Sequence, residues 1–568
     1  MHVLGISCFF HDAAAALLKD GVLVAAAEEE RFTRKKHDFE FPIHAIEHVL
    51  AAGGIAAGAL DYVAFFEKPF VKFERILMTS LQMFPRATRV FREAMITWLL
   101  DKLWVSALIT ERLGVPRDRI LFSEHHLSHA ASSFFCSPFD EAAILTVDGV
   151  GEWATATMGR ARGTGITLAR EIRFPHSIGL LYSTFTAFLG FEVNEGEYKV
   201  MGMAPYGVPR YADDVRKLVR MAPDGSFRLD MDYFTFHHST RLPYSRKFLA
   251  LFGEPRAPEG AVTPHYADVA ASIQAVTEEL VLNMARAVQR ETGLTRLCLA
   301  GGVALNSVAN WKILRQTGFE ELYVQPAAGD SGGAVGAALY AYHSLLGHPR
   351  RFVMEHAFWG AGYGEAAIGA FLDGENIPYE RLPEPALLDR VVELLAAGQV
   401  VGWFQGRFEW GPRALGHRSI LADPRRAEMK DVVNTKIKFR EPYRPFAPSV
   451  LAERVPDFFD APGVERQYPA RFMLLVTDVR PDKRAVIPAV THVDGTGRLQ
   501  SVVREGNTRY YDLIARFGQA TGVPVVLNTS FNVRGEPIVN TPGEAYRTFA
   551  QTGLDALVLG DHLVRKAH

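Results

Sequence analysis

Residues 3–32 read VLGISCFFHDAAAALLKDGVLVAAAEEERF, and residues 142–174 read AAILTVDGVGEWATATMGRARGTGITLAREIRF. Both segments follow one plan, in which an apolar strand reaches an aspartate, small residues lead into a second strand, the chain turns at glycine, and a third strand follows. Chance placement of strands in an α/β protein is the alternative explanation. The matching positions of Asp12 and Asp148 favour a duplication. The pair therefore predicts two related α/β lobes that face a cleft, the layout of actin/sugar-kinase (ASKHA) nucleotide-binding folds.

The rest of the chain also mixes strands and helices. Residues 43–115 are expected to be mostly helical, and residues 267–292 to form a long amphipathic helix. Two strand–turn–helix units follow, LCLAGGVALNSVANWKI (297–313) and LYVQPAAGDSGGAVGAALYAYHSLL (322–346). Proline and glycine loosen the pattern within residues 345–385, so we expect a domain boundary there, before a second α/β unit.

Composition is that of an ordinary globular protein. The chain has 568 residues, which predicts two or more domains, with 48% hydrophobic and 22% charged residues. The net charge of −2 argues against a nucleic-acid partner. The three cysteines lie far apart and form no C-x-x-C pair.

Targeting signals are not expected either. The N-terminus MHVLGISCFFHDAAAALL lacks a basic region and carries His11 and Asp12 within its apolar run, unlike a signal peptide. The most apolar helical stretch is interrupted by Asp101 and Lys102, so it falls short of the ~18–20 apolar residues of a membrane span. We expect a soluble, cytoplasmic protein with no membrane partner.

Residues 124–135, EHHLSHAASSFF, place His125 and His129 four positions apart on an expected helix. Such a pair shares one helix face, which suits either a polar helix end or a metal site. Further ligands are available, because Asp148 ends the strand ILTVD and Asp330 follows the strand LYVQP. Two imidazoles and two carboxylates suit Fe(II), Mn(II) or Zn(II). Each carboxylate has a rival role in binding the magnesium of a nucleotide.

Two glycine-containing turns are candidates for binding a nucleotide. SIGLLYS (177–183) and AGGVALNS (300–307) each precede a helix, where backbone N–H groups can face an anion, and the Asn306 side chain can bind a ribose or base. Glycine before a helix also serves packing or a turn. Together with the duplicated unit, the two turns favour a nucleotide between the lobes. The candidate contacts are Ser177, Gly179, Lys199, Gly301, Gly302 and Asn306.

Cations gather after residue 400. They lie in GRFEWGPRALGHRSILADPRR (406–426), NTKIKFREPYRPFAPSV (434–450), THVDGTGRLQSVVRE (491–505) and LNTSFNVRGEPIV (527–539). A solvated face is the alternative, but these cations alternate with glycine, proline and aromatic residues rather than following a helical period. The arrangement suits a pocket for several phosphates, which arginine grips with two parallel hydrogen bonds.

These motifs, in this order, carry a resemblance. HDAAAALLKDG, AEEERFTRKKH, EHHLSHAASSFF, AGGVALNS, EWGPRALGHRSILADPR, KFREPYRPFAPS, HVDGTGRLQ and LNTSFNVRGEPIV are distinctive and span nearly the whole chain. The chain resembles the O-carbamoyltransferases of the NodU/CmcH/TobZ family, which decorate nodulation factors, cephalosporins and aminoglycosides. The resemblance implies an enzyme of antibiotic or other secondary metabolism.

The resemblance also implies two domains. Residues 1–355 would form a two-lobed ASKHA domain similar to the TsaD-type threonylcarbamoyl transferases, with a His-x-x-x-His iron site. Residues 370–568 would form a YrdC-like α/β domain that makes carbamoyl-adenylate from carbamoyl phosphate and ATP, with magnesium as a possible companion of ATP. The first domain would then pass the carbamoyl group to an acceptor hydroxyl.

Residue roles follow from matching motifs. His125, His129, Asp148 and Asp330 would bind Fe(II), with His126 structural. His11 would be the general base, because an imidazole pKa of about 6.5 lies near working pH. Arg413, Lys438 and Arg444 would bind carbamoyl phosphate, while His492, Arg498, Asn528 and Ser530 would serve ATP.

Three other functions compete with this one. An actin-fold sugar kinase leaves the Arg-rich domain without a role. A fused tRNA threonylcarbamoylation-type enzyme fits poorly with the absence of a net basic charge. A non-catalytic nucleotide-binding regulator leaves His11 and the metal set without purpose. We expect a small hydroxylated acceptor, contacted from residues near 70–115 and 230–265. Its identity is open, as is the oligomeric state, for which a homodimer is possible.

Overall fold

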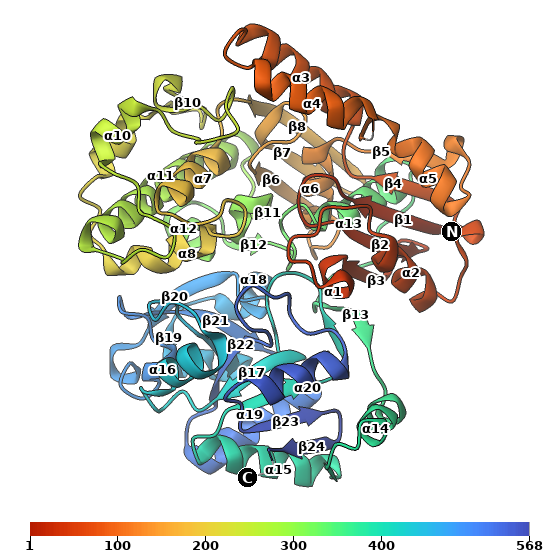
Figure 1. The fold of residues 1–568 in the computed structure, drawn as a ribbon, viewed down its shortest axis with the longest axis vertical. Helices are drawn as coiled ribbons and strands as arrows, with labels where there is room; N and C mark the ends of the chain where they lie inside the picture. The colour runs from red at the N-terminus through yellow and green to blue at the C-terminus, as the bar shows by residue number, and fades with distance from the viewer. Residues whose placement is uncertain (101, 567–568) are drawn as a thin grey trace. The chain divides into compact units, whose positions relative to one another are not determined.

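The computed structural model describes residues 1–100 and 102–566, and the chain divides into two compact units (Figure 1). The first unit comprises Met1–Ala26 and Phe39–Val353, and the second Ala27–Asp38 and Met354–His568. The sequence analysis assigned all of residues 1–355 to one domain and did not separate residues 27–38. Among the described residues, no helix is both long and apolar enough to cross a membrane.

The first unit contains two five-stranded sheets of the same topology. In each, the first strand is central, a meander of two strands lies on one side of it, and two further strands lie on the other. One sheet has the order β3-β2-β1-β4-β5 and the other β12-β11-β6-β7-β8. The first-to-second strand pairs are antiparallel, while β4 and β11 run parallel to the central strands. This repeated order confirms the predicted duplication and the ASKHA-like α/β fold.

The strand bounds show how closely the copies correspond. The first sheet consists of β1 (His2–Ser7), β2 (Ala14–Lys19), β3 (Val22–Glu28), β4 (Tyr62–Phe65) and β5 (Ile120–Phe122). The second consists of β6 (Glu141–Val147), β7 (Ala154–Arg162), β8 (Gly165–Arg173), β11 (Arg296–Ala300) and β12 (Glu321–Tyr323). Asp12 and Asp148 each fall between the first and second strand of their sheet, as predicted.

Helices α6 (His125–Phe134) and α13 (Gly332–Tyr340) pack against each other in the first unit (Figure 1). Their contact is so close that a Cβ atom on Gly336 would lie 1.9 Å from the carbonyl oxygen of Ser128. A Cβ on Gly5 of β1 would lie equally close, 1.9 Å, to the carbonyl of Ala334. Glycine therefore lets α13 rest on both β1 and α6, which fixes the two helices that border the candidate metal site.

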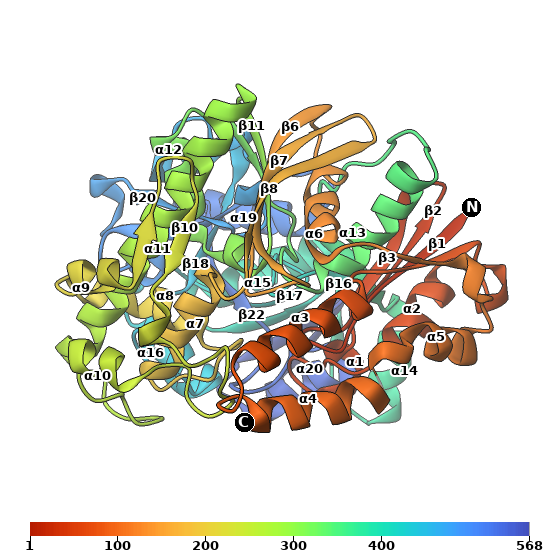
Figure 2. The ribbon, with the colours of Figure 1, turned by 90° about the horizontal axis from the view of Figure 1, so that it is seen from above.

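The remaining helices of the first unit cover the sheets. They include α2 (Ile43–Ala52), α3 (Pro69–Gln82), α4 (Thr88–Leu100), α5 (Val105–Leu113), α7 (Ile178–Phe188), α8 (Glu197–Met203), α11 (Pro264–Thr292) and α12 (Ser307–Gln316). Helices α3 and α4 lie side by side (Figure 2). The expectation that residues 43–115 are mostly helical missed β4. This strand is only four residues long and three of them are buried, so it shows no alternation.

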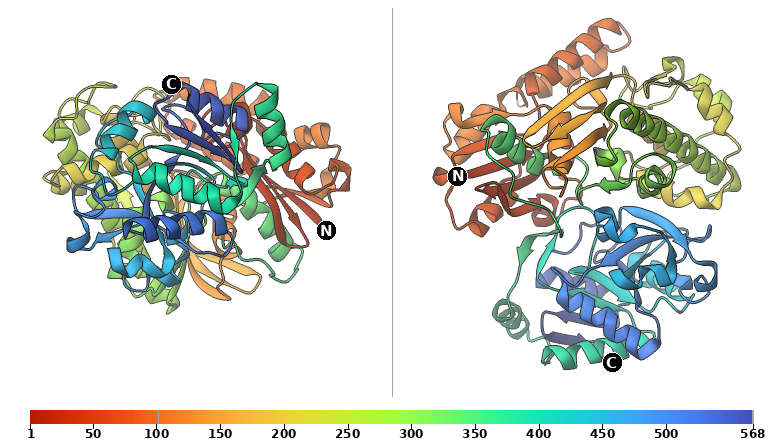
Figure 3. Two further views of the ribbon diagram at one scale, coloured as in Figure 1. Left: turned by 90° about the horizontal axis from the view of Figure 1, so that it is seen from below. Right: turned by 180° about the vertical axis from the view of Figure 1, so that it is seen from behind.

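The second unit is built on a ten-stranded mixed sheet (Figure 3). Its order is β14 (Glu380–Arg381), β24 (His562–Arg565), β23 (Ala556–Leu559), β15 (Val401–Phe404), β17 (Arg418–Ala422), β22 (Val525–Ser530), β18 (Ala447–Leu451), β21 (Thr496–Val502), β20 (Leu475–Val479) and β19 (Phe459–Asp460). Helices α15 (Glu384–Ala396) and α19 (Thr508–Thr521) pack together, and their apolar faces join buried strand residues such as Trp403 in one core. The predicted helix and strand at the start of this unit, α15 and β15, are confirmed.

Candidate functional site

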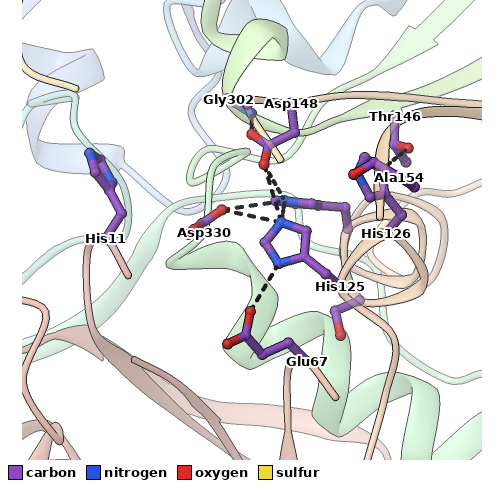
Figure 4. A network of polar contacts seen from close by, with 12 residues as sticks. His11, Glu67, His125, His126, Thr146, Asp148, Ala154, Gly302 and Asp330 are labelled. Atoms are coloured by element: carbon purple, nitrogen blue, oxygen red, sulfur yellow. Dashed lines mark hydrogen bonds and ion pairs between the residues drawn. The ribbon is translucent and has the colours of Figure 1, made fainter. Parts of the chain in front are cut away.

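Four side chains of the first unit converge at the point where α6, β6 and α13 meet (Figure 4). His125 and His129 come from α6, Asp148 directly follows β6, and Asp330 precedes α13 by two residues. His125 Nε2 lies 3.0 Å from His129 Nε2 and 3.2 Å from Asp148 Oδ2. Asp330 Oδ1 lies 3.6 Å and 3.5 Å from the Nε2 atoms of His125 and His129. All four side chains are buried, so the structure brings together the whole predicted metal set.

The geometry of this group fits a shared cation. Ligand atoms at about 2.0–2.2 Å from one ion lie roughly 3.0–3.5 Å from each other in tetrahedral or octahedral arrangements. Four separations between these atoms, 3.0–3.6 Å, lie close to this spacing, and a fifth, between His129 Nε2 and Asp148 Oδ2, is 3.8 Å. Within residues 1–100 and 102–566, the second oxygen of Asp330 has no hydrogen-bond partner. Two imidazole nitrogens and two carboxylates form a donor set for a divalent transition metal.

The pKa values of His125 and Asp148 also favour a bound cation. Burial by itself lowers the pKa of His125, but the carboxylates of Asp330 and Asp148 outweigh burial and raise that pKa to about 10. Burial raises the pKa of Asp148, yet its hydrogen bonds to the two histidines hold that pKa well below its usual value. Without a metal, the cluster thus gathers protons on its histidines. A bound metal ion replaces such protons.

Supporting residues hold the ligands from behind. Glu67 Oε2 lies 3.8 Å from His125 Nδ1, and the Lys72 ammonium lies 2.5 Å from the same carboxylate. Glu152 accepts the backbone N–H of His125 at 3.0 Å, which anchors the first turn of α6. The backbone N–H of Gly302 binds Asp148 Oδ1 at 2.7 Å. The sequence analysis missed Glu67 and Glu152. Glu67 lies two residues after the buried strand β4, close to a strand end as Asp148 is, and that position could have marked it.

His126 points away from the four ligands. Its Nδ1 lies 2.6 Å from Thr146 Oγ1 on β6, and its Nε2 lies 2.9 Å from the carbonyl of Ala154 on β7. Burial and the neighbouring histidines lower its pKa to about 3, so it is neutral. His126 ties α6 to the second sheet and supplies no donor atom to the metal group.

His11 stands apart from the ligands, in the turn between β1 and β2 (Figure 4). Its Nδ1 lies 2.7 Å from Asp12 Oδ2, and its Nε2 lies 3.2 Å from the carbonyl of Asn194. The turn is strained, because Phe9 and Asp12 adopt φ angles of 74° and 42°. Burial lowers the pKa of His11, but the Asp12 and Asp330 carboxylates raise it to about 10. The ordinary imidazole pKa of the sequence analysis therefore does not hold here.

Two of the predicted nucleotide contacts, Ser177 and Gly179, lie at the start of α7. Ser177 caps α7 by accepting the N–H of Leu180 at 3.0 Å, and its hydroxyl donates to the Gly149 carbonyl at 2.7 Å. A Cβ on Gly179 would lie 2.7 Å from the Asp148 carbonyl oxygen, so close packing there needs glycine. The backbone around β6 and the start of α7 therefore pack tightly together.

The glycine turn after β11 is bonded within the protein. The N–H groups of Gly301 and Gly302 donate to the Ala328 carbonyl, at 2.9 Å, and to Asp148, at 2.7 Å. This differs from the exposed N–H groups that the sequence analysis expected, because the Asp148 carboxylate itself takes the anion's place. A nucleotide role for these residues stays a prediction.

Asn306 and Lys199 lie farther along. The Asn306 side chain caps α12 at Ala309 N, 3.2 Å away, and exchanges hydrogen bonds of 3.1 Å with Gln274. Lys199 lies on α8, with its ammonium 5.6 Å from the centre of the Phe191 ring. Both positions have structural partners, and their nucleotide roles also stay predictions.

A cluster of cations forms the second candidate site, within the second unit. Lys438 ends the π-helical turn Asn434–Lys438 and donates to the carbonyls of Ser530 and Asn532, both at 2.8 Å. Burial and the charges of Arg440, Arg444 and Lys36 lower the pKa of Lys438 well below its usual value.

Arg498 on β21 belongs to the same cluster. Burial and the nearby charges of Arg413, Arg440 and Arg444 lower the pKa of its guanidinium. In the described part of the chain, Arg498 Nε has no hydrogen-bond partner. The Glu441 carboxylate lies 3.7 Å from Arg444. Buried like charges of this kind are costly unless an anion compensates them, so the cluster is suited to phosphate groups.

The residues assigned to ATP do not form a separate group. Ser530 Oγ lies 3.2 Å from the Lys438 ammonium, so a residue assigned to ATP touches one assigned to carbamoyl phosphate. The pKa of His492 falls to about 4 through burial and the charges of Arg498 and Lys430, which outweigh Asp494. His492 Nδ1 lies 3.0 Å from Thr496 Oγ1.

Asn528 is placed differently. It is fully buried in the sheet and donates to Ser449 Oγ at 3.2 Å and Gln500 Oε1 at 2.9 Å. Its side chain links neighbouring strands inside the sheet and is not exposed at the surface. The assignment of Asn528 to ATP stays a prediction.

Comparisons with known proteins cover both units. Residues 2–339 match the family described as "Carbamoyltransferase N-terminus", and residues 392–566 match "Carbamoyltransferase C-terminus". An uncharacterized protein of Synechocystis sp. is 48% identical over 100% of this chain and 97% of its own length. Nodulation protein NolNO of Sinorhizobium fredii is 40% identical over 98% of this chain and 79% of its own. The ROK hexokinase of Thermus thermophilus is 16% identical, with a TM-score of 0.31 over 61% of this chain and 99% of its own.

Proposed function

The chain belongs to the carbamoyltransferase family, and we propose that it transfers a carbamoyl group in two steps, each served by one of the two clusters. In the first step, water cleaves carbamoyl phosphate to phosphate and carbamate. The carbamate oxygen then attacks the α-phosphorus of ATP, which gives carbamoyl-adenylate and releases pyrophosphate. In the second step, an acceptor hydroxyl attacks the carbamoyl carbon and AMP leaves.

The cation cluster of the second unit is the observation that carries this proposal. Lys438 and Arg498 lie among other cations, and burial together with the repulsion from those cations lowers the pKa values of both side chains. Two phosphate-bearing substrates supply the charge that this cluster lacks. Arg413, Lys438 and Arg444 would hold carbamoyl phosphate, and His492, Arg498 and Ser530 would face ATP. The contact between Lys438 and Ser530 supports adjoining positions for the two substrates.

The four ligands of the first unit would hold one divalent ion, and the family resemblance favours Fe(II). When bound, such an ion acts as a Lewis acid and a template near the carbamoyl carbonyl. The protein itself contributes the orientation of these ligands. Glu67 faces His125, and Gly302 holds Asp148.

His11 would take the proton of the acceptor hydroxyl as its oxygen attacks. Asp12, 2.7 Å from His11 Nδ1, would orient the ring and stabilise its protonated form. A cation bound at Asp330 would offset that carboxylate and lower the pKa of His11 toward the range of a working base.

The acceptor would be a small hydroxylated molecule of secondary metabolism. The name of NolNO, a nodulation protein, supports an acceptor outside primary metabolism. The net charge of −2 supports a small acceptor over tRNA.

An assay of the two steps tests the proposal. The purified protein with ATP and carbamoyl phosphate should release pyrophosphate before any acceptor is added. A panel of hydroxylated natural products should then reveal an acceptor by a mass gain of one carbamoyl group. Two outcomes would contradict the first step: release of pyrophosphate in the absence of carbamoyl phosphate, and no release of pyrophosphate when both substrates are present.

A further inference from the structure

The second unit contains a segment from the N-terminal part of the chain. Residues 27–38 belong to it, although the residues on either side of them belong to the first unit. The chain therefore enters the second unit, leaves it, and returns only after Val353. A detour of this kind needs a physical reason, and the contacts of the segment supply one.

The segment grips the loop that carries Arg413. Glu28 Oε1 accepts the backbone N–H of Gly411 at 2.8 Å, and Arg31 Nη2 donates to the Gly411 carbonyl at 2.8 Å. The backbone N–H and carbonyl of Gly411 are thus both bound by one buried ion pair. In this pair Arg31 Nε lies 3.5 Å from Glu28 Oε2. Gly411 adopts a φ of 101°, a backbone conformation that glycine permits and that larger residues rarely adopt.

The far end of the same loop is fixed by another carboxylate. Glu409 Oε1 accepts the N–H groups of Leu415 at 2.7 Å and His417 at 2.9 Å. Arg413 therefore stands midway between two anchored points, one set by Glu409 and the other by the 27–38 segment. Removal of either anchor would loosen the backbone on one side of Arg413.

The 27–38 segment also reaches the other side of the cluster. Arg34 donates to the carbonyls of Pro537 and Ile538 at 2.8 Å and 2.7 Å, in the loop that follows Asn532. Asn532 is itself a partner of Lys438, through its carbonyl at 2.8 Å. The positive charge of Lys36, in the same segment, contributes to the lowered pKa of Lys438. The loop that carries Arg413 and the loop that follows Asn532 are thus both tied to one short segment.

We propose that residues 27–38 are a working part of the adenylate-forming site, in which Arg31 is a positioning residue that sets Arg413 for carbamoyl phosphate. This inference rests on the proposed function. Catalytic groups lose much of their effect when displaced by about 1 Å, roughly 10²-fold. Arg31 would therefore control the use of carbamoyl phosphate without touching it.

The test measures KM for carbamoyl phosphate in pyrophosphate release by the full-length protein. Arg31→Met should raise this KM on the order of 10- to 100-fold, with the thermal midpoint recorded alongside. In an Arg413→Ala background the same change should have no further effect, because Arg31 acts through Arg413. An additive effect in the double variant, or a wild-type KM in Arg31→Met, would overturn the inference.

Arg256→Met is the matched control. Arg256 is also a buried arginine, 6% exposed against 3% for Arg31, and it binds two carbonyls, those of Leu189 and Gly260, in the first unit. Its loss should leave KM for carbamoyl phosphate unchanged. If Arg31→Met does not fold, Arg34→Met tests the same segment from a more exposed position, through the Pro537–Ile538 carbonyls that follow the Lys438 partner Asn532. A wild-type KM for carbamoyl phosphate in Arg34→Met would overturn the role of residues 27–38 in this site. Absence of pyrophosphate release from the wild type would instead remove the proposed function itself.

Discussion

The two clusters of ionisable residues would be stabilised by ligands of opposite charge. The cluster in the first unit suits a cation, and the cluster in the second unit suits an anion. In the first unit, two carboxylates crowd two histidines, so the pKa of His125 is raised and that of Asp148 is lowered. In the second unit, cations crowd one another, and the pKa values of Lys438 and Arg498 are lowered. His125, Asp148 and Lys438 are buried and Arg498 is partly buried, and uncompensated charge is costly in such positions.

The difference supports the proposal that each cluster serves one of the two half-reactions. A site that attracts protons onto its histidines attracts a metal cation in their place. A site whose ammonium and guanidinium groups repel each other gains stability from phosphate oxygens. Removing a charge from one cluster should therefore impair one half-reaction and leave the other intact, and each prediction below depends on that independence.

The largest effect is expected for His129→Ala. Loss of one of four ligands should remove most of the metal and reduce carbamoyl transfer by more than the ~10- to 100-fold typical of supporting residues. Pyrophosphate release should continue, because the cation cluster is untouched. Elemental analysis and the two half-reaction assays check this result.

His126→Gln provides the control for that variant. His126 lies in the same helix and is equally buried, but it bonds to Thr146 and Ala154 and not to the ligand group. The His126→Gln protein should retain its metal. Full metal occupancy in His129→Ala would show that the four-ligand assignment is wrong.

His11→Asn should lower transfer to the acceptor by about 10²–10⁴-fold, the usual contribution of a general base. Metal content and pyrophosphate release should stay near wild type, because His11 contacts Asp12 and Asn194 rather than the ligands. Single-turnover transfer from preformed carbamoyl-adenylate measures the step directly. Transfer within a few-fold of wild type would assign the proton to another group.

The pH profile sharpens the same prediction. A base works when deprotonated, so the transfer rate should rise as pH increases through the pKa of His11. With that pKa raised to about 10 by Asp12 and Asp330, the rising limb should extend into the alkaline range. Metal loading should shift the limb to lower pH, because the ion offsets Asp330. The His11→Asn protein should show no such limb.

Arg498→Ala tests the other cluster. A charge-assisted contact to phosphate contributes about 1.5–3 kcal/mol, so substrate use should fall by about 10- to 150-fold. The assay is pyrophosphate release at limiting carbamoyl phosphate and at limiting ATP, which also tells which substrate Arg498 contacts. Metal content should not change. A wild-type rate under both conditions would remove Arg498 from the site.

Much of the fold of the first unit could be predicted from the sequence, because its signals are local. The strand–Asp–glycine-turn pattern occurs twice, and each copy lies within about thirty residues. The short strand β4 could not be predicted, since a buried strand of four residues has no period. The place of residues 27–38 in the second unit depends on contacts with Gly411 and Pro537, which no local pattern reveals.

The grouping of the four candidate ligands could be predicted for a similar reason. Helical spacing brings His125 and His129 onto one face, and carboxylates at strand ends gather at one edge of a sheet. The environment of each group could not be predicted. The pKa of His11 depends on Asp330, more than three hundred positions away, as well as on the adjacent Asp12. Glu67 reaches His125 because the residues after β4 lie against α6, where Ser128 Oγ donates to the Phe66 carbonyl at 2.8 Å. Proximity of this kind is a property of the fold.

Glu67→Gln should weaken metal binding by about 10- to 100-fold, as for other residues that orient a histidine ligand. The Glu67 carboxylate faces His125 Nδ1 at 3.8 Å and favours the ring orientation that aims Nε2 at the ion. Competition with a chelator of known affinity measures the change. Because this substitution would leave Lys72 buried without its anion, the Glu67→Gln/Lys72→Met double variant is the control for that cost. Equal affinity in Glu67→Gln and wild type would limit Glu67 to pairing with Lys72.

The smallest effect is expected in stability, and it distinguishes the clusters in the absence of ligands. Arg498→Met removes one charge from a group of mutually repelling cations while keeping much of the side-chain volume. The ligand-free protein should become more stable by about 1 kcal/mol, because removing buried like charge is often neutral or stabilising. Carbamoyl phosphate should then stabilise the variant less than the wild type, since part of its binding energy is gone. Urea unfolding with and without carbamoyl phosphate measures both quantities. A ligand-free Arg498→Met protein clearly less stable than the wild type would mean that Arg498 is held by the fold, and that the second cluster is balanced without any anion.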